Sequence, residues 1–507
     1  MANTSEPKRT LAKVSETKLG ITVKKSENFS EWFTQVCSES GAQLADVRYG
    51  VQGFVVHRPW AMRIARKIYD AFEAEVEADG HEPYLFPTAI PEENLMKEKK
   101  HAGFTPNVFW IDYAGSQKLE RRIALRPTGE AQIYPMYALW IQSYKDLPWK
   151  GYQSRITVFR NEMTTRPFLR GREFMFFETH DVFRTHDDAL LQIKKDMEIM
   201  ERVVSEKMKI PFIFFKRPSW DKFLGADNSF CSDTLNPDGR RNQISSTHDL
   251  GQNFAKAFDI KFDDEKRTQS YGWQTCFGPG IWRLIAALIA IHGDDNGLIL
   301  PVEFAPVQAV IIPILFAGKE ESNARVLEAC TFAQRVAQDA GLRTHIDLRS
   351  DTPGFKFNDW ELKGVPLRIE IGPKDVEKKQ AVIVRRTDKK KTQVEMKQLG
   401  KTLLEEARTV DVEISKRSQN YFKDNTRTAI TLQETIQLIE TSRGFIKIPW
   451  CSTADEGKKC EEIFSKETTG GVICGTPFEN EETPKKGMNC VVCGKPAKHI
   501  VWVAKSI

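Results

Sequence analysis

The stretch Phe159-Arg160-Asn161-Glu162 is followed, after a short turn segment, by Arg170-Gly171-Arg172-Glu173-Phe174. Residues two apart in a strand share a face, so two strands joined by this turn would present arginine side chains beside an aromatic ring. Guanidinium groups bind phosphate through paired donors, and an aromatic ring can stack on a purine. The stretch therefore predicts a hairpin that binds ATP, with a solvated hairpin carrying scattered ion pairs as the alternative.

Length and composition limit the possible architectures. A chain of 507 residues exceeds what one hydrophobic core supports, which predicts two to four domains. Hydrophobic residues make up 40% and charged residues 28%, as in globular proteins, and no apolar run is long enough to span a bilayer. The net charge of +5 allows an RNA partner without requiring one. We expect a cytoplasmic protein that does not enter a membrane, with a flexible tail at residues 1–28.

Helices and strands do not alternate regularly in the first part of the chain. The segment from Pro59 to Asp79 has apolar residues at mostly helical spacing and ends before a glycine, and residues 189–208 predict another helix. A short strand is expected from Tyr84 to Pro87. This irregular order favours a mixed sheet.

From Val307 the pattern changes to that of a compact α/β domain of about a hundred residues. We expect a buried strand, an amphipathic helix, two further strands and then a helical region. These elements are predicted, in order, at Val307–Ile312, Glu320–Asp339, His345–Leu348, Leu367–Ile371 and Thr409–Ser442.

Three more motifs place chemically useful groups on turns. Gly278 and Gly280 precede a buried helix with Arg283 in its first turn, where backbone and dipole favour an anion, although such a motif is more often a tight turn. The loop Arg126–Glu130 carries a hydroxyl and a carboxylate, and simple N-capping by its threonine is the alternative. The segment Ser245–Phe254 surrounds a histidine with hydroxyl groups, and a satisfied polar residue is the alternative there.

Together these pieces resemble the class II aminoacyl-tRNA synthetases. Pro87 after a long helix resembles the first motif of that class, Phe159–Phe174 the second and Gly278–Arg283 the third. Within the class, the sequence is most similar to the prolyl-tRNA synthetases of the archaeal and eukaryotic type. The strings that carry this resemblance are Arg126–Glu130, Thr247–Phe254, His292–Pro301 and Pro353–Pro366.

The resemblance implies an α+β fold and an ATP-dependent ligase. A class II catalytic domain with a mixed, mainly antiparallel sheet is expected at residues 29–301, an α/β anticodon-binding domain at 302–405 and a small α+β zinc-type domain at 406–507. Such an enzyme activates L-proline with ATP, transfers it to tRNA(Pro) and forms a homodimer. The chain has no insertion between the second and third motifs, so the resemblance implies no cis-editing domain and some activation of alanine or cysteine.

The resemblance also implies roles for individual residues. Catalysis would rest on Arg160 and Arg283, which neutralise phosphate charge, with Mg²⁺ bridging the phosphates of ATP. The implied ATP ligands are Arg160, Glu162, Arg170, Phe174, Gln243 and Arg283. The implied proline pocket comprises Thr128, Glu130, Arg160, Phe176, His180, Phe223 and His248. The implied readers of the anticodon are Phe357, Glu361, Arg368 and Lys374.

The end of the chain carries its own metal motif. Cys490-Val-Val-Cys493 is a typical zinc knuckle, and Cys451 and Cys460 supply a second pair of thiolates for a structural Zn²⁺ site. The loop between the second pair is longer than zinc knuckles usually have, so Cys474 as a substitute ligand and a site without metal are the alternatives.

Two sequence features differ from those of the family, and two other functions compete. Ile244 and Ile281-Trp282 stand where the family usually has small residues, and Ile507 stands where many relatives end in tyrosine.

A sister synthetase for threonine or glycine is disfavoured because the threonine enzymes hold zinc in the catalytic pocket, whereas the clustered cysteines here are C-terminal. A catalytically dead paralogue that binds tRNA would need none of the ATP-binding residues.

Overall fold

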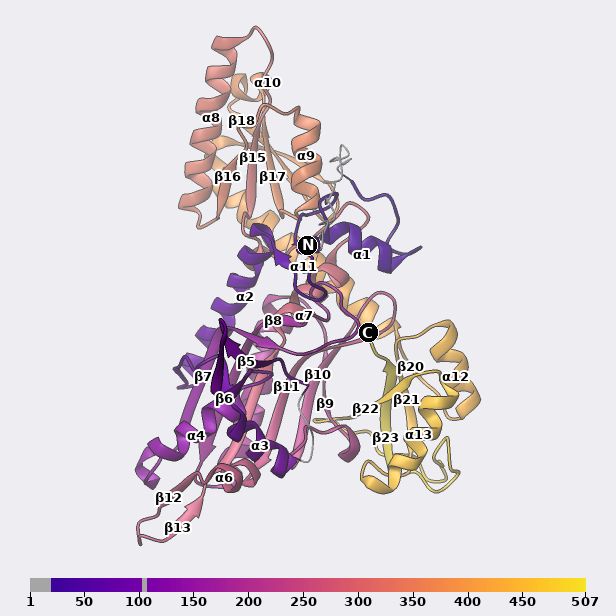
Figure 1. Cartoon of the computed structure of the whole chain (residues 1–507). Coiled ribbons are helices and arrows are strands. Elements are labelled where there is room, and N and C mark those ends of the chain that lie inside the picture. Colours follow the sequence, from indigo (N-terminus) through magenta and orange to yellow (C-terminus); the bar gives the residue numbers. More distant parts are fainter. Residues whose placement is uncertain (1–19, 103–106) are drawn as a thin grey trace, which may run out of the picture.

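The computed structural model describes residues 20–102 and 107–507, with the side chains of 98–102 left aside. The predicted tail at 1–28 therefore lies mostly outside the described residues. Figure 1 shows three parts: an α+β unit built on a large sheet, an α/β unit at the top, and a small α+β unit beside the large sheet. This arrangement confirms the expected fold class.

One sheet of eleven strands runs through the first and third parts. The strand order is β20-β21-β23-β22-β9-β10-β11-β14-β8-β7-β3, and every neighbouring pair is antiparallel except β20–β21 and β3–β7. The sheet is therefore mixed and mainly antiparallel, as predicted. The strands span, in that order, Thr426–Thr428, Phe445–Trp450, His499–Lys505, Gly471–Pro477, Ile213–Lys216, Asn228–Leu235, Arg241–Gly251, Trp273–Pro279, Glu173–Phe183, Trp149–Phe159 and Glu82–Pro83.

Helices pack on this sheet through apolar faces. The predicted helix after Pro59 is confirmed as α2, Pro59–Ala78, whose buried side includes Ile64, Ile68 and Phe72. The helix predicted at 189–208 is confirmed as α5, His186–Met200, which continues as a π-helical segment to Lys207. The other helices of this part are α1 (Phe29–Cys37), α3 (Glu92–Ala102), α4 (Glu130–Trp140), α6 (Asn253–Phe258) and α7 (Ile281–Ala287).

The strand predicted from Tyr84 to Pro87 was wrong. The paired residues are Glu82 and Pro83 of β3, which lie beside β7, and the chain then leaves the sheet. The Tyr84 N–H makes one more bond to β7, to the Tyr152 carbonyl over 2.8 Å, and Pro87 has no N–H with which a ladder of hydrogen bonds could continue. Short strands elsewhere in this part form small ribbons: β1 (Ala45–Asp46), β2 (Val56–His57), β4 (Ala89–Pro91), β5 (Trp110–Ala114), β6 (Gln117–Leu125), β12 (Lys261–Asp263) and β13 (Gln269–Tyr271).

The α/β part agrees closely with the prediction. Its sheet has β15 (Ala309–Pro313) between the parallel strands β16 (Thr344–Ile346) and β17 (Leu367–Ile371), followed by the antiparallel β18 (Gln380–Arg385) and β19 (Lys391–Glu395). The helices are α8 (Glu320–Asp339), α9 (Pro353–Leu362) and α10 (Pro373–Glu377). The predicted α8 and β17 match to the residue.

Helix α11, Leu399–Asp424, lies where the three parts meet (Figure 1). Its first half packs in the core of the α/β part through Leu403 and Val410, and Ser418 donates to the carbonyl oxygen of Lys209 in the part built on the large sheet. The helical region predicted from Thr409 to Ser442 was thus wrong as one element. Helix α11 is separated from α12, Leu432–Thr441, by a C-cap at Asn425, strand β20 and an N-cap formed by the Thr431 side chain. Helix α13 spans Lys458–Glu467.

No helix in the described part of the chain is long and apolar enough to cross a membrane.

An ion pair joins the α/β part to the part built on the large sheet. Arg386 donates to both carboxylate oxygens of Asp294 over 2.8 and 2.6 Å, and the arginine side chain is 1% exposed. Removing one partner of such a pair leaves a buried charge without compensation.

Asp294→Asn should therefore destabilise the protein. We expect the free energy of unfolding to fall by about 3 kcal/mol, measured by urea denaturation followed through tryptophan fluorescence. Glu265→Gln is the matched control, because the pair between Glu265 and Arg184 is about half exposed on both sides, 48% and 47%. That variant should unfold at the urea concentration of the wild type, and an equal shift in both variants would contradict the prediction.

Candidate active site

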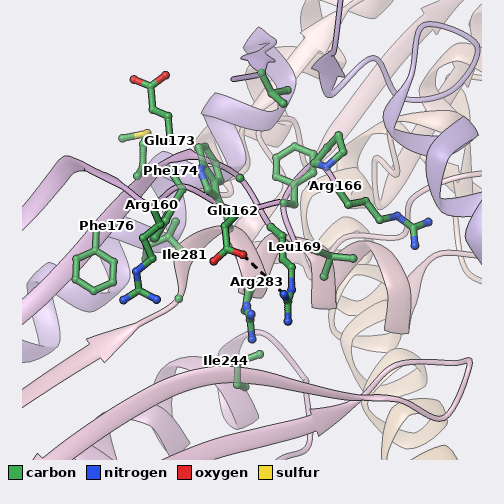
Figure 2. A pocket seen from close by; sticks show the side chains of 18 of the residues that line it. Arg160, Glu162, Arg166, Leu169, Glu173, Phe174, Phe176, Ile244, Ile281 and Arg283 are labelled. Atoms are coloured by element: carbon green, nitrogen blue, oxygen red, sulfur yellow. Dashed lines mark ion pairs between the residues drawn. The ribbon is translucent and has the colours of Figure 1, made fainter. Parts of the chain in front are cut away.

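A cavity of about 350 Å³ opens beside the loop that joins β7 to β8. The loop, strand β11 and the start of α7 form its walls (Figure 2). Predicted ATP ligands that line it are Arg160, Glu162, Arg170, Phe174, Gln243 and Arg283. The structure thus brings together all six residues.

The predicted placement of Arg160 and Glu162 on a strand was wrong. Strand β7 ends at Phe159 and β8 begins at Glu173, so residues 160–172 form a loop. The loop is held by a hydrogen bond from the Arg172 N–H to the Gly53 carbonyl, 2.9 Å, and Phe168 has a positive φ of 62°. A positive φ is incompatible with a strand, so alternation between faces does not apply here.

The cavity is electropositive. Arg283 is buried, and this burial, together with the nearby Arg170, lowers its pKa to about 10. Figure 2 shows the side chains of Arg160 and Arg283 extending to the same side of the loop, with the Glu162 carboxylate between them, whereas Glu173 extends away. Glu162 lies 3.8 Å from Arg170. One nearby carboxylate does not neutralise three arginines, so this space suits an anion.

Aromatic rings form the other wall. Phe174 contacts Phe176 edge to face, with ring centroids 6.2 Å apart. The bulky Trp282, at a position where the resemblance implies a small residue, stacks on His57 of β2 at 4.2 Å. The larger side chain is therefore accommodated by a partner from the N-terminal ribbon.

A second, buried group of polar side chains lies deeper along β8. The Thr128 hydroxyl donates to the Glu130 carboxylate over 2.6 Å, and burial raises the pKa of Glu130. His180 contacts Glu178 at 3.0 Å through Nε2 and the Tyr134 hydroxyl at 2.9 Å through Nδ1. Burial alone would lower the pKa of His180, but the Glu178 carboxylate outweighs it and raises the pKa. The pocket holds two buried carboxyl groups, those of Glu130 and Glu178, against the one imidazole of His180, so it suits a further cationic group.

N-capping by Thr128, the structural alternative, is wrong. The residue that precedes α4 is Gly129, and the Thr128 hydroxyl is directed to Glu130 instead of a backbone N–H. Glycine is required at 129 because a Cβ there would lie 2.3 Å from Oε1 of Glu178.

The far wall of this pocket contains Phe223 and His248, whose rings lie 4.8 Å apart. Nδ1 of His248 contacts the Ser229 hydroxyl at 2.7 Å, and burial lowers the pKa of His248 to about 3. The histidine is therefore neutral at physiological pH. Strand register places His180, Cys276, His248 and Ser229 in one row across four neighbouring strands.

Sequence reasoning missed three residues of this pocket: Glu178, Tyr134 and Cys276. Side chains alternate between the two faces of β8, so Glu178 lies between Phe176 and His180 on the same face. This alternation would have identified Glu178 from the sequence. Cys276 lies within 4.8 Å of both Glu130 and His180. Both ring nitrogens of His180 already have protein partners, so the group offers no free imidazole nitrogen to a metal.

The predicted anticodon residues only partly come together. Arg368 on β17 lies over the Phe357 ring at 4.1 Å and contacts Glu361 at 3.3 Å, both on α9. Lys374 lies beyond the end of β17, on α10, and is exposed. Among the described contacts, none joins Lys374 to the other three.

The predicted zinc ligands converge in the C-terminal part. The sulfur atoms of Cys451, Cys460, Cys490 and Cys493 all lie within 4.8 Å of one another, and those of the first pair are 3.6 Å apart. Four thiolates about 2.3 Å from a zinc ion would have this spacing. Cys474 lies on β22 in a separate apolar cluster with Phe215, which disfavours it as a ligand.

Comparisons with known proteins agree with this geometry. Residues 109–292 match the model of the tRNA synthetase class II core domain (G, H, P, S and T). Residues 308–406 match the anticodon binding domain, and residues 432–507 match the prolyl-tRNA synthetase C-terminal domain. The three matches follow the order of the three parts of the fold.

Relatives resemble the chain over almost its full length. The proline–tRNA ligase of Thermofilum pendens is 50% identical, covering 96% of this chain and 99% of the relative, and that of Pyrococcus abyssi is 41% identical, covering 95% and 98%. A structure of Giardia lamblia prolyl-tRNA synthetase in complex with prolyl-adenylate superposes with a TM-score of 0.91 at 32% identity, covering 96% of this chain and all of that one. The chain therefore belongs to the prolyl-tRNA synthetase family.

Gly129→Ala should damage the buried pocket without touching a ligand directly. The new methyl group would displace Glu178 and weaken its contact with His180, so kcat/KM for proline in ATP–pyrophosphate exchange should fall about tenfold. Gly354→Ala is the matched control, since a Cβ at that position meets nothing within 4 Å. Wild-type kinetics of the Gly129→Ala variant would contradict the prediction, because they would show that proline activation does not depend on this position of the Glu178 side chain.

Proposed function

We propose that this protein is a proline–tRNA ligase that converts L-proline and ATP to prolyl-adenylate and pyrophosphate, and then transfers proline to the 3′ end of tRNA(Pro). The observation that carries the proposal is the pairing of two sites of opposite charge along β8. The cavity with Arg160 and Arg283 suits phosphate, and the pocket with Glu130 and Glu178 suits an ammonium group. An amino acid has both an ammonium group and a carboxylate, so it can span the two.

Adenylate formation requires in-line attack of the proline carboxylate on the α-phosphorus of ATP. Arg160 would contact the α-phosphate and Arg283 the γ-phosphate, while Arg170 and Gln243 complete the nucleotide site and Phe174 stacks on adenine. These groups position the reactants and stabilise the negative charge of the transition state, so no covalent nucleophile from the protein is needed. Mg²⁺, when bound with ATP, would neutralise phosphate charge, and Glu162 is the carboxylate directed to that space.

Proline selection would occur in the buried pocket. Glu130 would face the secondary ammonium with Thr128 beside it, and the ring would lie among Phe176, His180, Phe223 and His248. Burial raises the pKa of Glu130, so a cationic ligand favours its ionised form, and an ionised Glu130 in turn favours the ligand. Neutral His248 adds no competing positive charge.

The other parts fit a translation enzyme. We propose that Phe357, Glu361, Arg368 and Lys374 contact the anticodon, and that the catalytic, anticodon-binding and C-terminal domains span 29–301, 302–405 and 406–507. The last boundary lies inside α11, which joins the two units.

We also propose a cytoplasmic homodimer. The dimer is supported by large apolar side chains that are exposed near Pro87, with Leu85 83% and Leu139 67% exposed.

Two further proposals concern accessory features. The elements from Arg184 to Gly272 contribute strands and helices to the catalytic sheet and its surroundings, so we propose that the chain has no cis-editing domain and would not hydrolyse alanyl-tRNA. We propose a structural Zn²⁺ at Cys451, Cys460, Cys490 and Cys493, since four thiolates form a closed tetrahedral site.

ATP–pyrophosphate exchange over a panel of amino acids tests the main proposal. Proline should give the highest kcat/KM, and Arg160→Ala should lower it about a hundredfold or more, because that side chain stabilises the transition state. Arg184→Ala, which removes an exposed arginine paired with Glu265, should keep wild-type exchange. Preferential exchange with threonine or glycine would indicate a sister synthetase, and the absence of exchange would indicate a tRNA-binding paralogue.

Metal analysis tests the zinc proposal. The purified wild type should contain about one zinc ion per chain by mass spectrometry, and Cys490→Ser should lose it because three thiolates bind zinc far less tightly. Cys330→Ser, at a buried cysteine of the anticodon-binding part, should keep the metal. Wild-type protein that stays free of zinc after supplementation, or that has a disulfide among the four cysteines, would refute the site.

A further inference from the structure

A buried arginine connects the C-terminal part of the chain to the nucleotide cavity. Arg217 follows β9 directly, and its side chain is 1% exposed. Its Nη1 and Nη2 atoms donate to the two carboxylate oxygens of Asp233, each over 2.8 Å. A two-point contact of this kind fixes the plane of the guanidinium group.

The same guanidinium group contacts a predicted ATP ligand. Nη2 of Arg217 donates to Oε1 of Gln243 over 3.2 Å, and Gln243 lines the cavity. Because a guanidinium group can only donate, the oxygen end of the Gln243 amide must face Arg217. The NH₂ end is therefore the one presented to a ligand, which it can bind as a hydrogen-bond donor.

The remaining contact comes from the C-terminal part. Nη1 of Arg217 donates to the carbonyl oxygen of Cys474 over 2.6 Å, across 257 residues of sequence. Cys474 lies on β22, which pairs with β9 through Thr476 and Lys216. Gly475, which lies between Cys474 and Thr476, has a φ of 120°, and a Cβ at this position would lie 2.0 Å from the Lys216 carbonyl oxygen. Only glycine permits this approach.

We propose that Arg217 is a positioning residue that orients the Gln243 amide for ATP, and that the docked C-terminal part holds Arg217 in place through the Cys474 carbonyl. The inference deepens the proposed function and rests on it. Arg217 itself lies behind Gln243 and does not line the cavity. Its loss should therefore affect ATP binding through Gln243 and not through a direct contact.

A double-mutant cycle tests this coupling. Gln243→Ala and Arg217→Lys should each raise KM for ATP in pyrophosphate exchange about fivefold, with kcat and KM for proline little changed, because a neutral hydrogen bond to bound ATP is lost. Lysine keeps a positive charge opposite Asp233 but lacks the fork of donors that reaches both partners. The double variant should show the KM for ATP of Gln243→Ala alone.

Two further variants separate positioning from general stability. Gly475→Ala should move β22 away from Arg217 and raise KM for ATP in the same way, again without further effect when Gln243 is already alanine. Arg385→Lys alters a comparable buried arginine that pairs with Glu406 in the anticodon-binding part. It should lower the melting temperature without changing KM for ATP.

The outcomes distinguish this inference from the proposed function. A KM for ATP within twofold of wild type in Arg217→Lys, or an additive increase in the double variant, would overturn the inference while proline-dependent exchange continued. If the wild type showed no such exchange, the proposed function would fail. The dissociation constants for ATP of the same variants, measured by calorimetry, would then test the coupling between Arg217 and Gln243 directly.

Discussion

The period-two alternation of side chains along β8 is the constraint on which both the site and the core depend. On one face, Phe174 and Phe176 line the nucleotide cavity, and Glu178 and His180 continue into the buried pocket. On the other face, Phe177 packs against Tyr69 and Phe72 of α2. A shift of β8 by one residue would exchange these faces and remove the site and the core contact together. Pairing with β7 and β14 on both sides makes such a shift costly.

The distribution of charge along this face gives the substrate a direction. The arginines lie near the loop end of β8, whereas Glu178 lies farther along the strand and Glu130, at the start of α4, belongs to the same buried pocket. A zwitterionic amino acid bound with its ammonium group among the carboxylates would direct its own carboxylate toward the arginines and the bound phosphates. The pocket with Glu130 and Glu178 is buried and excludes much of the surrounding water, so its interactions with the ammonium group are stronger than they would be at an exposed surface. Orientation thus follows from the placement of the two charged groups at different positions along β8.

The sequence allowed the prediction of elements whose cause is local. Helix α8 and strand β17 were predicted to the residue because apolar periodicity and flanking turn residues determine them. The loop at 160–172 was misassigned because its shape depends on contacts such as that between Arg172 and Gly53, over a hundred residues apart. The structure still brings together in one cavity the six residues that were predicted to bind ATP, since their chemistry is apparent without their conformation. Glu178 was overlooked although the alternation of β8 was sufficient to indicate it.

The contacts of the C-terminal part could not have been predicted from local pattern. Its strands extend the catalytic sheet through β22 and β9, and the close approach at Gly475 has no signal in the neighbouring sequence. A sheet that continues through hydrogen-bonded strands transmits a displacement more directly than a flexible linker would. Arg217 lies one residue beyond β9, at the point where the two parts are paired, and its side chain reaches the strand that lines the nucleotide cavity. The proposed nucleotide site is therefore connected through Arg217 to a segment of chain that follows the anticodon-binding part, although none of that segment lines the cavity.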